Sequence, residues 1–576
     1  MRKILTGWGS GGGCRAALSA LLVCAGAARV WAAPDVLMSA LDAELKRNVQ
    51  GLSRAEKVPL YHLGYEVWDG RDYYASATVG AMTGEYDYRY RVLGVDARVG
   101  SPKLDNTHQV KGPEAWRYGQ NANRIDLPTD DDAAALRAGL WLNTDRAYKD
   151  ALNRYTKVET NKSVTATEED GSDDFSSEEP VVHADTAALS AVDAGPWRER
   201  LRRLSRALKP YAFIHQSGVL LSVETENRYI ANSEGTRIAA GSRYVTLSYS
   251  MTSQTTDGMS LARSKSYNSD SLADLPPDDV VLRDMKVSVA ELDALRKAPL
   301  ISPYSGPAII RNRATAVYFH EILGHRLEGH RQKIEGEGQT FTKMVGQRVV
   351  SPLISVYDDP TLSRFRGTFL RGAYAFDDEG VPSRRLPLVE HGILKNFMTS
   401  RMPIKGFERS NGHGRREKGR QVVPRMGNTI IEASETVSYE KLRERLIDEI
   451  RRQGKPYGLI FDDIAGGFTM TTRERPQSFK VLPLLVYRVY ADGRPDEPVR
   501  GVDIVGTPLA AFAKIAAAAD DDAVFNGSCG AESGQVPVSG VAPSVLVTEI
   551  EVERKAKSSE QPPVLPVPFH DEEAAR

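Results

Sequence analysis

Two histidines and a glutamate stand close together in residues 320–325, which read HEILGH. Many metal-dependent hydrolases carry two histidine ligands four positions apart on one helix face, with a glutamate beside the first as general base. Here the histidines are five positions apart, which places them about 140° apart around a regular helix. A wider, π-type turn tolerated at Gly324 would return them to one face. The segment therefore predicts His320 and His325 as metal ligands and Glu321 as general base. The alternative is a set of polar helix residues without a metal.

A third ligand has to come from elsewhere in the chain, because a catalytic zinc site takes three protein ligands and keeps one position open for water. The candidates are Cys529, His330, Glu328 and His413. His330 lies on the same local segment as the pair and could simply cap a helix or face solvent. Cys529 lies in a glycine-rich loop, and a thiolate held by a metal is protected from oxidation. We therefore predict Cys529 as the third ligand of one divalent metal, with zinc favoured and iron tolerated by mixed His and Cys ligation.

The first 33 residues have the pattern of an export signal. Arg2 and Lys3 supply a basic start, residues 16–28 are apolar, and residues 30–32 form a small-residue cleavage pattern. The apolar run is shorter than the about 20 residues that a membrane-spanning helix needs. We expect cleavage near Ala33, an exported and periplasmic protein, and no membrane span. The alternative is an uncleaved anchor.

The cysteine count fits this expectation. The chain has three cysteines, and Cys14 and Cys24 lie inside the expected signal. Only Cys529 would then remain, in an oxidising compartment where an unprotected thiol is a liability. A buried inert cysteine is the ordinary alternative, and a catalytic nucleophile is a third.

Composition excludes one large class of partner. The 75 basic residues nearly balance the 76 acidic ones, and no basic stripe with interleaved aromatic residues is present, so nucleic-acid binding is not expected. The chain is 41% apolar and 26% charged, as in ordinary globular proteins.

We expect an α+β fold with two domains, because 576 residues exceed the usual size of one domain. The N-terminal part reads as helices and strands of an α/β-type domain, and the C-terminal part is strand-rich and opens with the helix that carries the histidines. Within that strand-rich part we expect helices at 439–453 and at about 508–519. The expected divisions are a signal at 1–33, an N-terminal α+β domain at 34–275 with an acidic mobile insertion at about 156–193, a C-terminal metallopeptidase domain at 276–556 and a disordered tail at 557–576.

The segment from His320 to Arg331 resembles the central motif of the TldD/PmbA family of metallopeptidases. The resemblance is carried through the C-terminal half by further segments in the same order: Gly372-Ala373-Tyr374, Asp377 to Pro382, Gly392-Ile393-Leu394, Asn411 to Glu417, Pro424 to Thr429, and Ser528-Cys529-Gly530 with Gly534-Gln535 and Pro537-Val538. Asn232 to Gly235 matches more loosely in the N-terminal half.

The resemblance implies more than the residues show by themselves. Because both histidines, the glutamate and the cysteine are present, the chain is similar to the TldD-like branch that keeps the metal motif. The family forms dimers around an internal chamber in which extended or unfolded peptides are cleaved, so a homodimer or a heterodimer with a related subunit is expected. Two departures are His330, where an acidic residue is expected, and the export signal. The competing hypotheses are a catalytically silent partner subunit and a hydrolase that uses Cys529 as nucleophile.

Overall fold

The computed structural model describes residues 35–54, 58–110, 124–164, 170–334, 336–472, 479–506 and 512–555, with residues 563, 565, 567 and 568 of the tail. The expected signal at 1–33 and most of the expected tail lie outside these residues. No helix among the described residues has the length and apolar character to cross a membrane.

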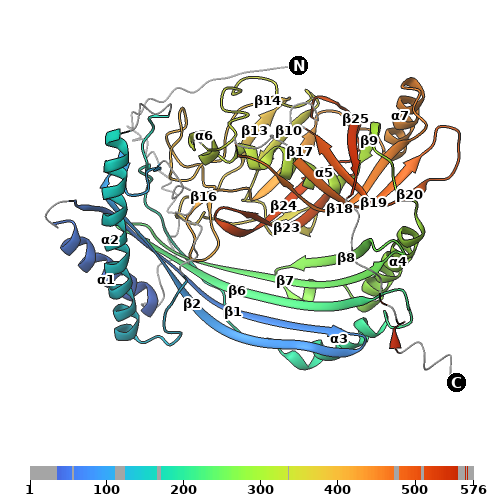
Figure 1. Ribbon diagram of the computed structural model, residues 1–576. Coiled ribbons are helices and arrows are strands. Elements are labelled where there is room, and N and C mark those ends of the chain that lie inside the picture. The colour runs from blue at the N-terminus through green and yellow to red at the C-terminus, as the bar shows by residue number, and fades with distance from the viewer. Residues whose placement is uncertain are drawn as a thin grey trace, which may run out of the picture.

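Four long antiparallel strands form the centre of the N-terminal sheet (Figure 1). They are β1 (Leu60–Thr78), β2 (Ala81–Ser101), β6 (Gln216–Asn232) and β7 (Arg237–Gln254). The turn between β1 and β2 is tight, and Val79 and Gly80 both have positive φ, as a two-residue hairpin of this twist requires. The shorter strands are β3 (Leu104–Asp105), β4 (Ile125–Asp126), β5 (Val182–Asp185) and β8 (Ser260–Ser269). The sheet order is β3-β2-β1-β6-β7-β5, with β4 on β2 and β8 on β7.

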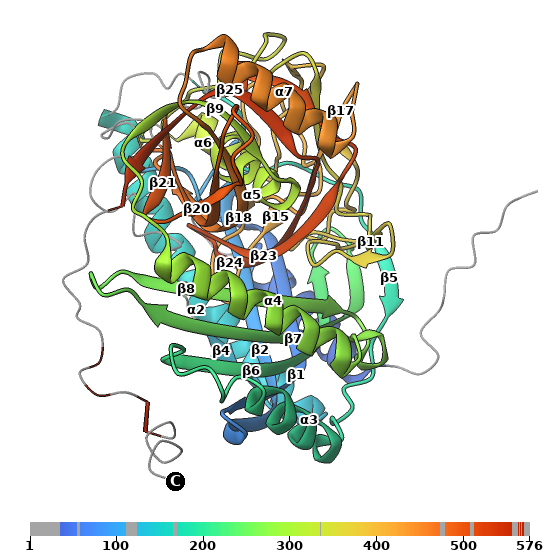
Figure 2. The ribbon, with the colours of Figure 1, turned by 90° about the vertical axis from the view of Figure 1, so that its right-hand side faces the viewer.

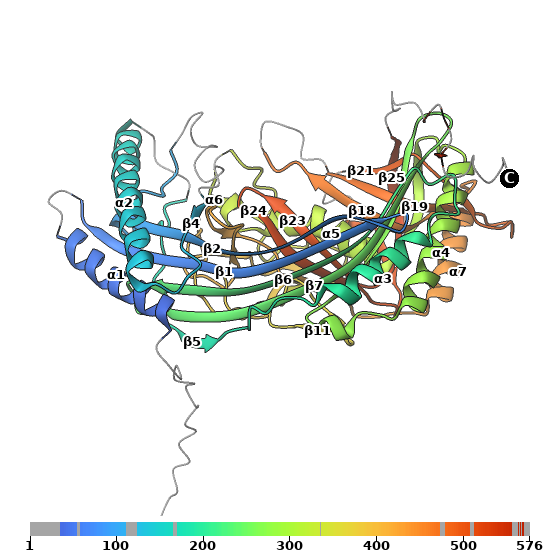
Figure 3. The same ribbon diagram turned by 90° about the horizontal axis from the view of Figure 1, so that it is seen from below.

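Helices cover one face of this sheet, because odd-numbered residues such as Tyr65 and Val67 point to that face and are apolar. α1 (Val36–Leu52) and α2 (Ala133–Val164) pack near one end of the long strands, and α3 (Ala194–Arg206) and α4 (Asp278–Lys297) pack near the other (Figure 3). Figure 2 shows α4 lying along β8 and β7. The opposite face of the sheet, with even-numbered residues, is turned to the C-terminal half (Figure 1).

The acidic segment differs from the mobile insertion expected at 156–193. α2 continues to Val164, and the described residues from 170 onward contact both halves of the chain. Asp174 is buried and pairs with His108 at 2.7 Å and with Lys333 at 3.5 Å. The backbone N–H of Ser176 donates to the carbonyl of Arg401 at 2.8 Å. Buried charge pairing between distant residues, which composition does not reveal, therefore orders this segment.

Two sheets build the C-terminal half. The first has the order β14-β13-β10-β17-β24-β23. Its strands are β10 (Ile354–Asp358), β13 (Leu386–Glu390), β14 (Ile393–Leu394), β17 (Asn428–Ala433), β23 (Ala523–Ala531) and β24 (Gly534–Ala542). The second has the order β18-β9-β25-β21-β19-β20, and an additional pairing of β18 with β19 closes five of its strands into a ring. Its strands are β9 (Tyr304–Ile310), β18 (Gly458–Thr469), β19 (Phe479–Val489), β20 (Glu497–Val499), β21 (Val502–Gly506), β22 (Ile515–Ala518), which pairs with β25, and β25 (Val545–Arg554).

Helix α5 (Asn312–Ile322) lies between these two sheets and is buried over most of its length. It packs on β18 and β19 on one side and on β23 and β24 on the other. The largest apolar core of the molecule surrounds it and includes Phe319 and Ile322. Helix α7 (Tyr439–Arg452) covers the outside of β9 and β25, with a buried stripe of leucine and isoleucine.

The remaining elements are short. They are the 3-10 turns η1 (Leu272–Asp274) and η2 (Gly324–Leu327), helix α6 (His330–Lys333), and strands β11 (Arg364–Phe365), β12 (Thr368–Phe369), β15 (Gly414–Arg415) and β16 (Val423–Pro424).

The expected α+β class and the expected helix near 439–453 are confirmed. The helix expected at about 508–519 is wrong for its described C-terminal part, where Ile515–Ala518 form β22. Alanine-rich runs favour helix locally, but pairing with β25 in the tertiary structure overrides that preference.

Candidate metal centre

The two histidines of the HEILGH segment approach each other because the helix ends between them. α5 ends at Ile322, Leu323 has φ −105° and ψ −53°, and the tighter turn η2 begins at Gly324. The rings of His320 and His325 are then 5.0 Å apart, at 81° to each other. The expected π-type turn is therefore wrong, and a tightened 3-10 turn after the end of the helix brings the pair together.

Gly324 has a different role from the one expected. A Cβ atom at this position would overlap the side chain of Met426, which is fully buried. The glycine is therefore needed for close packing of η2 against the 424–429 segment, and not for an unusual backbone angle.

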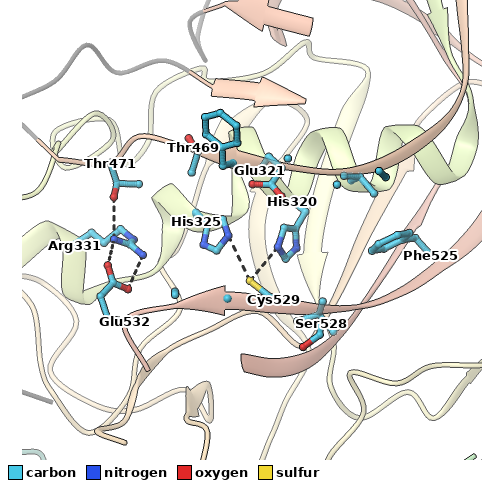
Figure 4. A pocket seen from close by; sticks show the side chains of 18 residues that line it. His320, Glu321, His325, Arg331, Thr469, Thr471, Phe525, Ser528, Cys529 and Glu532 are labelled. Carbon is cyan, nitrogen blue, oxygen red and sulfur yellow. Dashed lines mark hydrogen bonds and ion pairs between the residues drawn. The ribbon is translucent and has the colours of Figure 1, made fainter. Parts of the chain in front are cut away.

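Cys529 comes to this pair from β23, which packs against α5. Its Sγ lies 3.1 Å from Nε2 of His320 and 3.4 Å from Nε2 of His325 (Figure 4). The three donor atoms lie within 4.8 Å of one another, and the thiol is only 3% exposed. Two imidazole nitrogens and one thiolate are a donor set that suits zinc, and three protein ligands leave one position for water. The residues therefore fit a single divalent metal.

Glu321 faces this group from the side opposite Cys529 (Figure 4). It is 8% exposed, and a Cβ at Gly467 of β18 would lie 2.8 Å from its Cγ, so β18 covers it closely. No described residue forms a hydrogen bond or ion pair with its carboxylate. All four residues line one pocket of about 330 Å³. A free carboxylate beside an open metal position is placed to accept a proton from water.

Glu328 contacts the outer side of the ligand set. Its Oε1 lies 3.1 Å from Nδ1 of His325, and its Oε2 accepts from Arg331 at 2.8 Å. Such a carboxylate holds the imidazole with Nε2 turned toward the metal. Burial alone would raise the pKa of Glu328, but the nearby His325 and Arg331 lower it to about 2. Glu328, one of the candidate ligands, is therefore placed as a positioning residue for His325.

Arg425 supports the cysteine. Its Nη2 donates to Sγ of Cys529 at 3.1 Å and to the Cys529 carbonyl at 2.7 Å. Burial would raise the pKa of Cys529, but His325, His320 and Arg425 hold it well below its usual range. The pKa of His325 is correspondingly high, because the thiolate and Glu328 outweigh the effect of burial.

Arg425 and the arginines of the 411–417 loop make their hydrogen bonds inside the chain. Arg425 is fully buried. In the loop, Arg415 donates to the carbonyls of Met426 and Pro537, and Arg416 donates to Glu66 of the N-terminal sheet at 2.9 Å. These side chains are occupied by contacts inside the chain.

The other candidate ligands lie away from the pair. Nε2 of His413 is 3.3 Å from Asp358, and its Nδ1 contacts Asn411. His330 is 1% exposed, and its nearest charged partner is Glu532 at 3.7 Å.

Glu328, His330 and Glu532 form a second group of donor atoms within 4.8 Å of one another. The guanidinium of Arg331 already bonds both of the carboxylates in this group. A cation is therefore present there, and a second metal would be repelled.

A salt bridge that was not predicted from the sequence fixes the cysteine hairpin. Arg331 donates to Oε1 of Glu532 at 2.7 Å and to its Oε2 at 2.9 Å. Glu532 lies in the turn between β23 and β24, three residues after Cys529. An acidic residue in a turn next to a predicted ligand was the available signal, but its partner lies about 200 residues away in the sequence.

Comparison with known proteins agrees with this geometry. Residues 303–554 match the family model described as the PmbA/TldA metallopeptidase C-terminal domain. The C-terminal part of the chain is therefore a domain of the TldD/PmbA family type. The matched range begins at β9 and includes all of the candidate ligands.

The similar proteins carry related names. A protein of Haemophilus influenzae named metalloprotease TldD homolog is 30% identical over 284 residues, which are 48% of this chain and 55% of that protein. A zinc metalloprotease TldD homolog of Saccharolobus solfataricus is 25% identical over 248 residues, which are 43% of this chain and 51% of that protein. The chain thus spans about half the length of these curated relatives. The solved structure of TldE from Thermococcus kodakarensis shares the fold, with a TM-score of 0.58, 14% identity and coverage of 89% of this chain and 100% of that one.

Proposed function

We propose that this TldD/PmbA family protein is a metal-dependent peptidase, with His320, His325 and Cys529 as ligands of one divalent metal and Glu321 as general base. The observation that carries the proposal is the convergence of two imidazoles and a thiolate beside an unpaired carboxylate in one pocket. The names of the relatives support a peptidase, and one of them is named a zinc enzyme. Zinc is the favoured metal, and iron is the alternative.

The protein's own groups divide the work of hydrolysis. His320, His325 and Cys529 would hold the metal, which would supply a water molecule of lowered pKa and polarise a peptide carbonyl. The carboxylate of Glu321 accepts the proton of the attacking water and passes it to the leaving amine. Glu328 keeps His325 in one orientation, and Arg425 stabilises the charge of the Cys529 thiolate. Residues 465–469 of β18 line the pocket, and Gly467 lies close to Glu321.

We propose extended or unfolded peptides as substrates. β18 pairs with β9 only at Leu459, Ile460 and Phe461. Beyond this point residues 465–469 line the pocket, and their described strand pairing is to β19 on the other edge. An extended peptide can add to a free strand edge through its backbone, with little dependence on its sequence. We also propose that the protein assembles into a homodimer or a heterodimer. Residues 1–33 are proposed to direct its export.

A second candidate function is a hydrolase with Cys529 as nucleophile. The short distance from Cys529 to His320 and the low pKa of the thiol are also features of a thiolate–imidazole pair. Cys529 Sγ, however, contacts two histidines and Arg425, whereas a thiolate–imidazole mechanism needs only one histidine. A silent subunit, the remaining alternative, would have no need for the complete donor set.

Metal analysis of the purified full-length chain tests the proposal. We expect one zinc per chain, and loss of most of it in His320→Ala, His325→Ala and Cys529→Ala variants that stay folded by circular dichroism. His215→Ala, far from the site, is the matched control. Full metal content in Cys529→Ala would exclude the cysteine as ligand, and peptide cleavage by fully metal-free protein would favour the cysteine nucleophile.

A further inference from the structure

The pocket around the ligands has two unlike walls (Figure 4). Phe525 lies on one side of the ligand set, and Arg331, Thr471 and Glu532 lie on the other. A substrate chain that crosses the site has to place one side of its scissile bond against each wall. The nature of the walls therefore bears on which peptide bonds can be cleaved.

The register of β23 sets the first wall. Phe525, Gly527 and Cys529 alternate with outward residues, so they share the face turned to α5. A Cβ at Gly527 would lie 2.7 Å from the ring of Phe525, which shows that this ring leans over the glycine toward Cys529. Val538 pairs with Gly527, and Val317 lies one helical turn before His320. Both valines line the pocket, so the wall beside the ligands is apolar.

The second wall is polar, and its charges are already paired. Arg331 donates to Glu532 through two nitrogens and also to Thr471 at 3.1 Å. The same guanidinium is bonded by Glu328 and Glu337 in the protein interior. A substrate residue beside this wall therefore contacts hydrogen-bonding groups but no large unpaired charge. A large apolar side chain would displace water from these groups without replacing the hydrogen bonds that the water made.

We propose that the site selects peptide bonds flanked on one fixed side by a large apolar residue, which packs against Phe525, and on the other side by a small or polar residue. This inference rests on the proposed peptidase function and names its substrate class. Phe525 is the residue that determines the preference. A charged side chain in its place would lose hydration beside the ring without gaining a partner.

Two measurements on the full-length, zinc-loaded chain test the inference. The probes are fluorescein-labelled peptides of one Gly-Ser background with a single central Leu, Phe, Ala, Glu or Lys. Turnover is followed by mass spectrometry, which identifies the bond. Binding is followed by fluorescence polarisation with Glu321→Gln, so that the preference is read without turnover.

We expect the Leu and Phe peptides to be cleaved on the same side of that residue, with kcat/KM about 10- to 100-fold above the Ala, Glu and Lys peptides. Phe525→Ala should lower the Leu and Phe values to near that of Ala, and Phe525→Leu should keep most of the preference. Phe525→Lys should favour the Glu peptide. Phe365→Ala, a half-buried phenylalanine outside the pocket, should leave the order unchanged.

The outcomes separate the inference from the function on which it rests. Cleavage of all five peptides at similar rates would overturn the inference but not the proposed peptidase function. An unchanged preference in both Phe525→Ala and Phe525→Lys would have the same meaning. If Glu321→Gln binds the apolar peptides preferentially but the parent protein cleaves none of them, the apolar subsite at Phe525 is supported and the peptidase function is excluded. Absence of both preference and turnover rejects both.

Discussion

Glu321 is a buried acidic residue of the site, and among the described residues it has no cationic partner. Glu328 contacts His325 and Arg331, and Glu532 contacts Arg331. A carboxylate that already accepts two charged hydrogen bonds is a weak base, whereas an unpaired one beside the ligands can exchange a proton. The division of roles among these three glutamates therefore follows from their partners and not from their residue type.

Replacing Glu321 with Gln keeps its shape and removes its ability to accept a proton. We expect Glu321→Gln to lose at least about 10²-fold in kcat, in line with typical general-base contributions. Zinc content and peptide binding should stay close to those of the parent protein, because no proposed ligand changes. Steady-state kinetics together with metal analysis check this. Glu390→Gln, on β13, is the control, and near-normal turnover by Glu321→Gln would exclude the general-base role.

At the scale of elements, the site is an alignment of one helix end with one hairpin. α5 and η2 carry the histidines, and the hairpin of β23 and β24 carries the cysteine. The turn of that hairpin is held by Arg331 through Glu532 and by Arg425, which donates to Ser533 at 2.8 Å and to the carbonyl of Gly534 at 3.0 Å. These bonds fix the distance between Cys529 and the histidines, so we treat Glu532 as a positioning residue.

Glu532→Gln should therefore weaken metal binding without removing a ligand. We expect the rate of zinc loss to a chelator to rise by roughly 10-fold, as for other residues that orient ligands. The cobalt-substituted protein should show a changed visible spectrum, because the sulfur position changes. Glu337→Gln is the matched control: it removes a carboxylate from the same guanidinium at 3.1 Å but is not on the hairpin. Equal effects of the two variants would contradict positioning through the hairpin.

The close packing of η2 on Met426 leads to a separate prediction about stability. Gly324→Ala should destabilise the protein by about 1–3 kcal/mol, the usual cost of overpacking. Adding Met426→Ala should make the double variant less destabilised than the sum of the two single variants, because the truncated side chain frees the space. Urea unfolding of the metal-free protein measures both. Gly51→Ala, in a helix where a Cβ meets nothing within 4 Å, is the control and should be neutral or stabilising by up to about 1 kcal/mol. Independent, additive effects would show that the two residues do not compete for space.

At the scale of the whole molecule, the ligands are placed where only a thin chain can reach them. His325 is 7% exposed and Cys529 is 3% exposed, and the pocket volume is about 330 Å³. The two halves of the chain are joined over the sheet face by ion pairs that include a buried partner, such as Arg401 with Glu234 at 2.6 Å and Asp378 with Arg228. Breaking such a pair leaves a buried charge without its partner, which is costly, so the halves should not separate easily to admit a folded protein.

We therefore expect the protein to cleave a reduced, unfolded protein and short peptides, and to leave the same protein intact when it is folded. The backbone of a folded substrate cannot approach a ligand set in which His325 and Cys529 are almost fully buried. Gel electrophoresis of both forms over time, with the size of the protease measured by light scattering, checks the prediction. A nonspecific protease added to each form serves as the control for accessibility. Equal digestion of the folded substrate would indicate an open cleft.

The sequence by itself determined the features that depend on near neighbours. The helix expected at 439–453 is α7, and the HEILGH segment with the remaining cysteine pointed to the donor set that the structure brings together. The spacing of five between the histidines also signalled an irregular backbone. It did not distinguish a π-type turn from a helix end followed by a 3-10 turn, because the choice depends on Met426 packing against Gly324 from another segment.

Only the tertiary structure decided which residues surround the ligands and which partners these residues have. Cys529 is more than 200 residues from both histidines and meets them because β23 packs along α5. Whether an acidic residue is solvated, as expected for Asp174, or buried in an ion pair, as observed, depends on partners distant in sequence. The same holds for Ile515–Ala518, whose helical preference yields to β25. Burial makes an unpaired charge costly, so the fold assigns each buried glutamate and arginine its partner, and that assignment leaves Glu321 without one.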